Sequence, residues 1–464
     1  MAKKTKAADL SIEEKLEQAL VVPGYEPYKI PDNWCWTTVG TVTNIYRGVS
    51  YKKNEGHSEK HMNDCLVLRG GNIQEGSIDT ETDNVFVNRD LVSGTQIIRK
   101  YDVIIVSSTG SKKVIGRAGI SFSDYSDVAF GAFLTLVRAN DYIYKPFIAY
   151  YLQSDIYRNR IRTLASGVNI NNIRNEYITE TPLSLPPLPE QQRIVERIES
   201  LFSKLDEAKE KAQEVIDSFE TRKAAILHKA FSGELTAKWR EENGVGIESW
   251  ERKTLGEVCN SIFDGDHMPP PKSESGIPFL VISNVNDGYL SFENTRFVPQ
   301  EYYDAITDTR KPEKGDVLYT LVGSFGIPVV VDTNAPFCFQ RHMALLKPKS
   351  INTYFLWYLL QSQEMYQKAS SIAKGVAQLT VPIKGLRLMD FNCPSEEEQI
   401  EIVRILDSLL EKEDTSKDNA KSIIDQIETM KKAILARAFR GELGTNDPEE
   451  GSAVEMLKQI LSGE

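Results

Sequence analysis

The sequence has little of what a disulfide-bonded, zinc-binding or membrane-spanning protein needs. Its 464 residues include five cysteines, and no two of them form a CxxC pair. The sequence therefore predicts neither a disulfide framework nor a cysteine-rich zinc site. No stretch approaches the roughly 18 consecutive apolar residues of a membrane span. The basic start MAKKTKAADL lacks the apolar run of a secretory signal, so we expect a soluble cytoplasmic protein in a reducing compartment.

Motifs of the common catalytic folds are also missing. The sequence has no GxxxxGK[ST] phosphate loop, no GxSxG turn and no GxGxxG following a strand. In the segment HSEKH, His57 and His61 are four positions apart, but a zinc protease needs the glutamate directly after the first histidine. We interpret HSEKH as a solvated loop, and FDGDH (Asp264, Asp266, His267) as a polar turn. The sequence therefore predicts no catalytic residue and no metal site.

The net charge of −11 argues at first against a nucleic-acid partner. However, residues 34–185 hold 17 basic and 15 acidic residues, and residues 250–395 hold 14 and 15. The excess of acid therefore lies outside two nearly neutral blocks, and basic patches remain possible within them.

A repeat organises the chain. Residues 190–235 align without a gap on residues 398–443, and 23 of the 46 pairs are identical, ending in AILHKAFSGEL and AILARAFRGEL. Prolines precede each copy, and Gly233 and Gly441 stand where the C-terminus of a helix needs a left-handed residue. Each copy therefore predicts one long helix of about 65–70 Å.

Apolar residues in both copies recur at alternating steps of four and three, which is typical of a coiled-coil seam. Arg222 interrupts the first stripe, and Glu413 and Ser416 interrupt the second. We expect the two helices to pair with each other, antiparallel, in preference to packing separately on their own domains. The predicted seam residues are Ile194, Ile198, Leu201, Leu205, Val215, Phe219, Ile226, Ile402, Leu406, Leu409, Ile423, Ile427, Met430 and Ile434.

The blocks between the helices repeat more faintly. KYDVIIVSS around Asp102 is similar to KGDVLYTLV around Asp316, and short β-branched runs between turn residues indicate strands. We expect an α/β (α+β) fold with two globular domains, two long antiparallel helices and a pseudo-two-fold internal repeat. The predicted boundaries are an N-terminal segment 1–33, block one 34–185, helix one 186–235, a linker 236–249, block two 250–393, helix two 394–443 and a tail 444–464. The two terminal segments should together replace the linker.

Basic, amide and aromatic residues gather in the blocks. Lysine and arginine neutralise phosphates, arginine reads guanine edges, and asparagine or glutamine reads adenine edges. In block one the candidates for DNA contact are Arg47, Tyr51, Lys52, Lys53, Arg69, Asn72, Lys112, Lys113, Arg117, Asn169, Asn171, Asn172 and Arg174. In block two they are Lys272, Asn284, Asn286, Arg341, Lys374, Gln378 and Lys384.

The motif SLPPLPEQQRIVERIESLF, followed by a helix that closes with AILHKAFSGELTAKWR, resembles the DNA-specificity subunit of type I restriction–modification systems, over residues 11–443. The resemblance implies two target-recognition domains, each binding one half of a split, asymmetric double-stranded DNA sequence, and two helices that set the spacing and dock two modification subunits. It implies that this chain binds no cofactor. S-adenosylmethionine would belong to the modification subunits, and ATP and magnesium to restriction subunits.

Two other classes remain open at this point: a self-contained nuclease with a coiled-coil arm, and a coiled-coil scaffold without DNA specificity. The second helix also departs from the first, because CPSEEEQ lacks the proline-rich run and no tryptophan follows the second GEL as Trp239 follows the first. Docking of the modification subunits is therefore expected to differ between the two halves.

If the helices act as a ruler, inserting four residues into both should change the number of unspecified base pairs between the half-sites and leave the half-sites themselves unchanged. Mapping methylated adenines in DNA modified by the complex would measure this. A change in either half-site would contradict the ruler.

Overall fold

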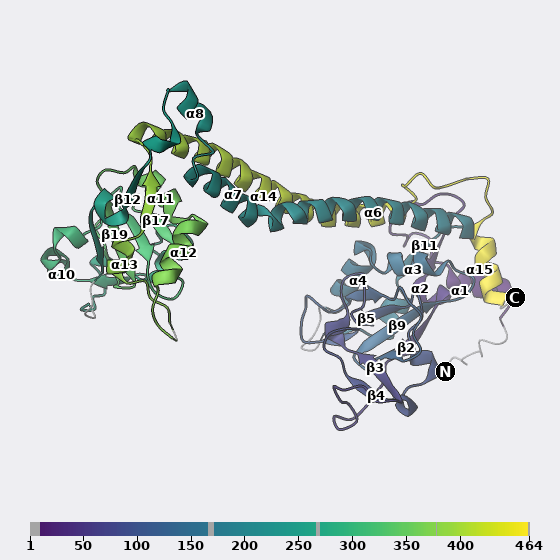
Figure 1. Cartoon of the computed structure of the whole chain (residues 1–464). Helices are drawn as coiled ribbons and strands as arrows, with labels where there is room; N and C mark the ends of the chain where they lie inside the picture. Colours follow the sequence, from purple (N-terminus) through teal and green to yellow (C-terminus); the bar gives the residue numbers. More distant parts are fainter. Residues whose placement is uncertain (1–9, 166–170, 266–269, 377, 463–464) are drawn as a thin grey trace. The chain divides into compact units, whose positions relative to one another are not determined.

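The computed structural model describes residues 10–165, 171–265, 270–376 and 378–462, which form two compact units (Figure 1). Unit 1 joins the described residues up to Lys211 with those from Ile423 onwards, and unit 2 comprises Ala212–Ser422. Each unit therefore holds one globular block and a stretch of both long helices. Among the described residues, no helix combines the length and the apolarity needed to cross a bilayer.

Unit 1 is built on two small sheets and a closing strand pair. The antiparallel sheet follows the order β2 (Thr43–Arg47), β9 (Leu134–Ala139), β5 (Val103–Val106), β7 (Ala118–Ile120). The second sheet follows the order β4 (Phe86–Asn88), β3 (Asp64–Leu68), β8 (Val128–Phe130), in which β3 and β8 are parallel. Strand β1 (Cys35–Thr38) pairs antiparallel with β11 (Pro182–Leu185), and β6 (Ser108–Thr109) pairs with β10 (Asn171–Asn172). The block's helices are α2 (Val39–Val42), α3 (Lys145–Tyr151), α4 (Asp155–Ala165) and α5 (Asn175–Thr179).

Unit 2 repeats this connectivity. Its antiparallel sheet follows the order β13 (Cys259–Asp264), β19 (Met343–Pro348), β16 (Val317–Thr320), β17 (Pro328–Val330). Its second sheet follows the order β15 (Arg296–Val298), β14 (Ile277–Leu280), β18 (Cys338–Phe339), and β12 (Glu251–Thr254) pairs with β20 (Asp390–Cys393). The helices are α9 (Leu255–Val258), α10 (Gln300–Ala305), α11 (Thr353–Leu360), α12 (Gln363–Ile372) and α13 (Ile383–Arg387). The predicted α+β repeat is therefore confirmed.

A buried ion pair stands at the same place in both blocks. Asp102 Oδ2 accepts from Arg138 Nη2 at 2.6 Å and from the backbone N–H of Arg99. Its counterpart Asp316 lies 3.0 Å from Lys347 Nζ and caps its own turn in the same way. Each pair joins the turn before the central strand to the fifth residue of the neighbouring strand, which explains why Asp102 and Asp316 repeat.

The long helices run antiparallel within each unit. They are α6 (Leu188–Asp217), α7 (Phe219–Phe231) and α14 (Glu396–Ala438). In unit 1, ion pairs join Asp206 to Lys431 and Lys209 to Glu428, so residue numbers rise on one helix as they fall on the other.

The first helix, predicted as one piece, is divided at Ser218. The Ser218 hydroxyl donates to the Glu214 carbonyl at 2.5 Å and accepts from Arg222. A serine that bonds back to the carbonyl four residues earlier often bends a helix.

The polar interruptions of the two stripes meet each other. Arg222 Nε lies 2.6 Å from Glu413 Oε2, and both side chains are only partly exposed. Two of the three predicted breaks in the seam are thus one ion pair within unit 2, and a charged pair at one level favours a single register of the helices.

Most of the predicted seam is buried or half-buried. Ile194, Ile198, Phe219, Ile402, Leu406 and Ile427 are buried, and Leu201, Leu205, Val215, Ile226, Leu409 and Ile434 are half-buried. Ile423 and Met430 are instead 44 % and 45 % exposed, while Ala420, Ile427 and Leu435 are buried. An α-helix has 3.6 residues per turn, so its side chains rotate by about 20° per heptad relative to a strict repeat of 3.5 residues. The line of buried side chains along α14 therefore no longer passes through Ile423 and Met430.

The Glu–Gln pair that opens each long helix fastens that helix to its block. Gln191 accepts from the backbone N–H of Tyr144 at 3.0 Å and donates to the Pro186 carbonyl at 2.9 Å. Gln399 makes the same two bonds to Asn352 and Pro394, at 2.8 and 2.9 Å. Both glutamines are buried.

The glutamates of these pairs accept hydrogen bonds from the segment that follows the C-terminal end of the other long helix. In unit 2, Glu398 accepts from Thr236 and Arg240, both at 2.6 Å, and from Trp250 Nε1 at 2.9 Å. Gly233, at the preceding helix end, has the predicted left-handed φ of +83°.

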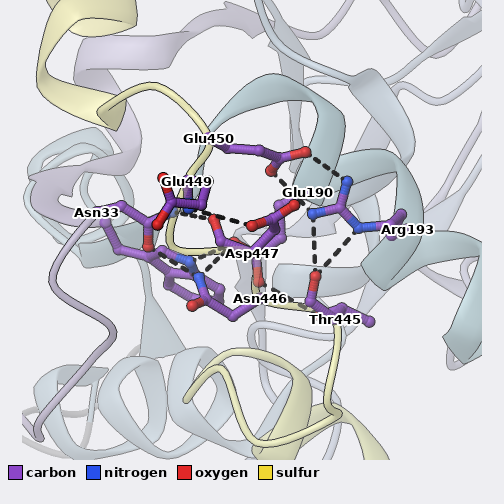
Figure 2. Close-up of polar contacts among 9 residues, drawn as sticks. Asn33, Glu190, Arg193, Thr445, Asn446, Asp447, Glu449 and Glu450 are labelled. Carbon is purple, nitrogen blue, oxygen red and sulfur yellow. Dashed lines mark hydrogen bonds and ion pairs between the residues drawn. The ribbon is translucent and has the colours of Figure 1, made fainter.

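In unit 1 the two ends of the chain supply the equivalent groups. Glu190 accepts from Trp34 Nε1 at 2.7 Å and from Asn446 Nδ2 at 2.9 Å, and Arg193 adds a paired contact to Glu450 (Figure 2). Helix α1 (Ile12–Ala19) packs against α15 (Ala453–Ser462), side by side in Figure 1. The terminal segments therefore do in unit 1 what the segment after α7 does in unit 2.

Substituting Glu398→Gln should lower the free energy of unfolding of unit 2 by about 3–5 kcal/mol, because the buried Arg240 guanidinium loses its counter-charge. The shift of the urea unfolding midpoint measures this. Glu401→Gln is the matched control, since its partner Arg404 is 67 % exposed and the loss should stay below about 1 kcal/mol. Equal shifts for the two variants would contradict the proposed role of the buried pair.

Candidate nucleic-acid interface

Three loops of unit 1 meet at one end of the antiparallel sheet. Strand β6, directly after β5, pairs with β10, which aligns Ser108 with Asn172. The backbone N–H groups of Ser107 and Ser108 both donate to the Phe133 carbonyl, each at 3.1 Å. We define loop edge 1 as residues 107–113, 131–133 and 171–174.

Unit 2 has the same three-loop arrangement. Leu321, directly after β16, donates to the His342 carbonyl at 2.8 Å and accepts from Val381 at 2.9 Å. Lys374 and Thr380 exchange two backbone hydrogen bonds of 2.8 and 2.9 Å, which form a small hairpin. We define loop edge 2 as residues 321–326, residues 340–342 and the described residues of 374–381.

Several predicted DNA contacts lie together on these edges. Lys112, Lys113, Asn172 and Arg174 are exposed on loop edge 1, and Arg341, Lys374 and Gln378 are exposed on loop edge 2. The backbone of Asn171 pairs with Thr109. Asn169 lies outside the described residues. Pairing of β6 with β10 thus brings together two sequence clusters about 60 residues apart.

The turn after β2 reaches loop edge 1 through glycine. A Cβ on Gly48 would lie 2.0 Å from the carbonyl oxygen of Gly131, so only a glycine permits this close approach of the two backbones. Arg47, Lys52 and Lys53 are exposed on this segment, while Tyr51 is half-buried against a small core cluster. In unit 2, Lys272, Asn286 and Lys384 are exposed on neighbouring loops and on α13.

Four predicted contacts serve the fold. Asn72 is buried, accepts from the backbone N–H of Arg69 at 2.8 Å and donates to the Thr82 carbonyl at 2.7 Å. Asn284 repeats this with Val281 and Glu293. Both asparagines are thus removed from the candidates, since a buried amide with both ends bonded to backbone has no reach to a base.

Two arginines of block one are also engaged. Arg69 pairs with Asp83, and Arg117 donates to the Ile73 carbonyl at 3.2 Å. Arg158 is buried on α4, where burial lowers the pKa of its guanidinium, and its Nη2 donates to the Lys113 carbonyl at 3.3 Å. Arg158 thus holds the backbone of the loop that carries Lys112 and Lys113.

Two residues on the loop edges were not among the DNA contacts predicted from the sequence. Phe133 is 69 % exposed at the tip of the β8–β9 turn, where an apolar ring finds no core to join. His342 lies beside Arg341, and burial, followed by the charge of Arg341, lowers the pKa of its imidazole. A lone aromatic residue between turn residues was the available signal for Phe133.

The charge on both edges has one sign. The six segments that form loop edges 1 and 2 contain Lys112, Lys113, Arg174, Arg341 and Lys374 but no aspartate or glutamate. Positive groups gathered at one edge of a unit attract a polyanion locally despite the negative net charge of the protein. The edges therefore have the chemistry of a phosphate-binding surface flanked by amides that can read bases.

Comparisons with known proteins identify the family of this chain. The family model described as type I restriction modification DNA specificity domain matches residues 31–217 and again 247–428. The specificity subunit of the type I restriction enzyme EcoKI from Escherichia coli K12 is 29 % identical over 93 % of this chain and 96 % of its own length. The specificity subunit of StySPI from Salmonella potsdam is 29 % identical over 89 % of this chain and 90 % of its own.

Solved structures share the fold. The HsdS subunit from Thermoanaerobacter tengcongensis matches with a TM-score of 0.60 and 23 % identity, over 90 % of this chain and 99 % of that one. A chain from a structure of the type I R-M system, studied for complex assembly and conformational transition, matches with a TM-score of 0.65 and 22 % identity, over 90 % and 100 %.

These similarities support neither the self-contained nuclease nor the scaffold without DNA specificity. The family model matches twice, once over each block and the helix that follows it, which is the repeat seen in the sequence and in the sheets. The chain therefore belongs to the type I restriction modification DNA specificity family and is a specificity subunit of such a system.

Proposed function

We propose that loop edge 1 and loop edge 2 each contact one half of a bipartite, asymmetric target in double-stranded DNA. The observation that carries this proposal is the absence of carboxylates from six loop segments that the fold gathers at equivalent sheet ends and that carry five cations. Cations bind phosphates and fix the position of the protein on DNA. The exposed side chains of Lys52, Lys53 and Lys272 would extend the contact along the phosphate backbone of the DNA.

Sequence reading would come from the amide and guanidinium groups on the edges. Asn172 and Gln378 have the paired donor and acceptor that match adenine, and Arg174 and Arg341 match guanine. The frameworks agree between the blocks, but SSTGSKK in block one stands where LVGSFG stands in block two. Different loops on one framework are expected to read different half-sites.

The long helices would fix the number of base pairs between the half-sites and bind the catalytic partners. We propose two modification subunits, which would carry S-adenosylmethionine, and restriction subunits, which would use ATP and magnesium. The chain would work in the cytoplasm, where its DNA target is. Support for a docking face comes from Ile423 and Met430, which are seven positions apart on α14 and therefore on one face, and are both exposed.

Removing two phosphate contacts should weaken DNA binding and reduce its dependence on salt. For Lys112→Ala/Lys113→Ala, the slope of log K against log salt should fall by about 2, because about one counterion is released for each phosphate neutralised. Fluorescence anisotropy of labelled target DNA with the complex of the chain and its modification subunits measures the slope between about 50 and 200 mM salt.

The matched control is Arg99→Ala/Lys100→Ala. These exposed residues precede β5 and so lie at the other end of the same strand, and the variant loses the same net charge. Its slope should match that of the unmodified complex. Equal losses in the two variants would show that net charge alone, and not loop edge 1, governs binding.

The docking face gives a separate prediction. Ile423→Lys/Met430→Lys should weaken the affinity for the modification subunit about tenfold or more, since buried apolar anchors carry much of the energy of an interface. Titration of one purified subunit with the other measures the affinity. Ser422→Lys/Thr429→Lys adds the same charges at exposed polar positions of α14, about 100° around the helix from Ile423 and Met430, and should bind normally. Unchanged affinity in the first variant would remove this face from the proposal.

A further inference from the structure

Three metal-ligating groups converge at the start of strand β3, on residues that the sequence assigned to a solvated loop. His57 Nε2 lies 2.6 Å from Asp64 Oδ2, and His61 Nδ1 lies 3.1 Å from the same oxygen. The two ring nitrogens are 3.0 Å from each other. The segment is a loop, but its imidazoles turn toward one buried carboxylate.

Hydrogen bonds alone satisfy this arrangement poorly. Asp64 Oδ2 also accepts from the backbone N–H of His61 at 2.7 Å, so three nitrogens point at one oxygen. If both ring nitrogens donate to the carboxylate, their hydrogens meet across the 3.0 Å contact between the rings. A cation held by both nitrogens and the oxygen replaces all three conflicting contacts by attraction.

The separations suit a small transition-metal ion. Zinc binds imidazole nitrogen at about 2.0–2.1 Å and carboxylate oxygen at about 2.0–2.2 Å. If the distances between the three ligand atoms increase by a few tenths of an ångström, a point at these metal–ligand distances from each of them lies just above the plane that they define. Two imidazoles favour zinc, cobalt, nickel or copper over magnesium and calcium, which prefer oxygen ligands.

The sheet holds two of the ligands in place. His57 exchanges backbone hydrogen bonds of 2.8 and 3.1 Å with Phe86 of β4, and Asp64 is the first residue of β3. The Asp64 side chain is 6 % exposed, whereas the His61 side chain is 67 % exposed. The third ligand can therefore close on the ion from the loop and leave a coordination position open to solvent.

We propose that His57, His61 and Asp64 form a binding site for one divalent cation of the zinc class. The bound ion would fasten the loop 57–64 to the edge between β3 and β4. Among the described residues, this is the group of histidine, cysteine and carboxylate side chains whose ligand atoms all lie within 4.8 Å of one another. The inference does not depend on the proposed DNA contacts.

The test uses the full chain, stripped of metal with a chelator and dialysed. Titration calorimetry with zinc chloride should show one ion bound per chain, and magnesium chloride should give no binding signal. Cobalt chloride should produce the visible absorption bands of a low-coordinate site. His61→Ala should weaken zinc binding at least tenfold, since the loss even of a group that only supports a ligand costs about 10–100-fold.

His228→Ala is the matched control, because His228 is exposed on α7 and lies outside the cluster. Its zinc affinity should equal that of the unmodified chain, and circular dichroism should show both variants folded. The proposal is overturned if the unmodified chain binds no zinc, or if His61→Ala binds zinc as tightly as the unmodified chain. The five cysteines are buried, so competition from thiols should be small.

Discussion

The fold depends on a buried glutamate–glutamine pair at the start of each long helix. Glu190–Gln191 and Glu398–Gln399 are buried residues with charge or amide groups, which is costly unless every polar atom has a partner. The partners come from the first tryptophan of the block, from the proline directly after the strand that precedes the helix and from the segment after the opposite helix end. One pair of side chains thus joins three parts of each unit.

This constraint separates what repeats from what varies. The pair, the buried Asp102–Arg138 and Asp316–Lys347 contacts and the sheet order are shared by both blocks, because they hold the framework. The side chains of the loops at the far end of the sheets make none of these contacts. They differ freely, and the exposed cations and amides collect there.

Sequence periodicity predicted the helices well and their contact line only in part. Ile194, Ile402 and Ile427 are buried as a heptad pattern requires, but Ile423 and Met430 turn outward because the pattern assumes 3.5 residues per turn. The interruptions Arg222 and Glu413 were visible in the sequence as defects of two separate stripes. Their role emerged only when the antiparallel register placed them 2.6 Å apart.

Residue type alone could not divide the candidate contacts into surface and support. Asn72 and Asn284 lie in turn segments, as an exposed asparagine that contacts a base would. Both are nevertheless buried, with their amides bonded to backbone. Conversely, the only sequence signal for Phe133 is a lone aromatic residue between turn residues, which does not reveal its exposure, because that results from the position of one turn relative to the core.

The sequence by itself determined the repeat, the two long helices, the mixed sheets and the family, since all of these follow from local periodicity and from motifs that a single chain displays. The tertiary structure decided which distant segments meet. It aligned Ser108 with Asn172, paired Arg222 with Glu413 and turned His57 and His61 toward Asp64. Such contacts depend on strand pairing and helix register over long separations, and those are set by the packing of the whole unit.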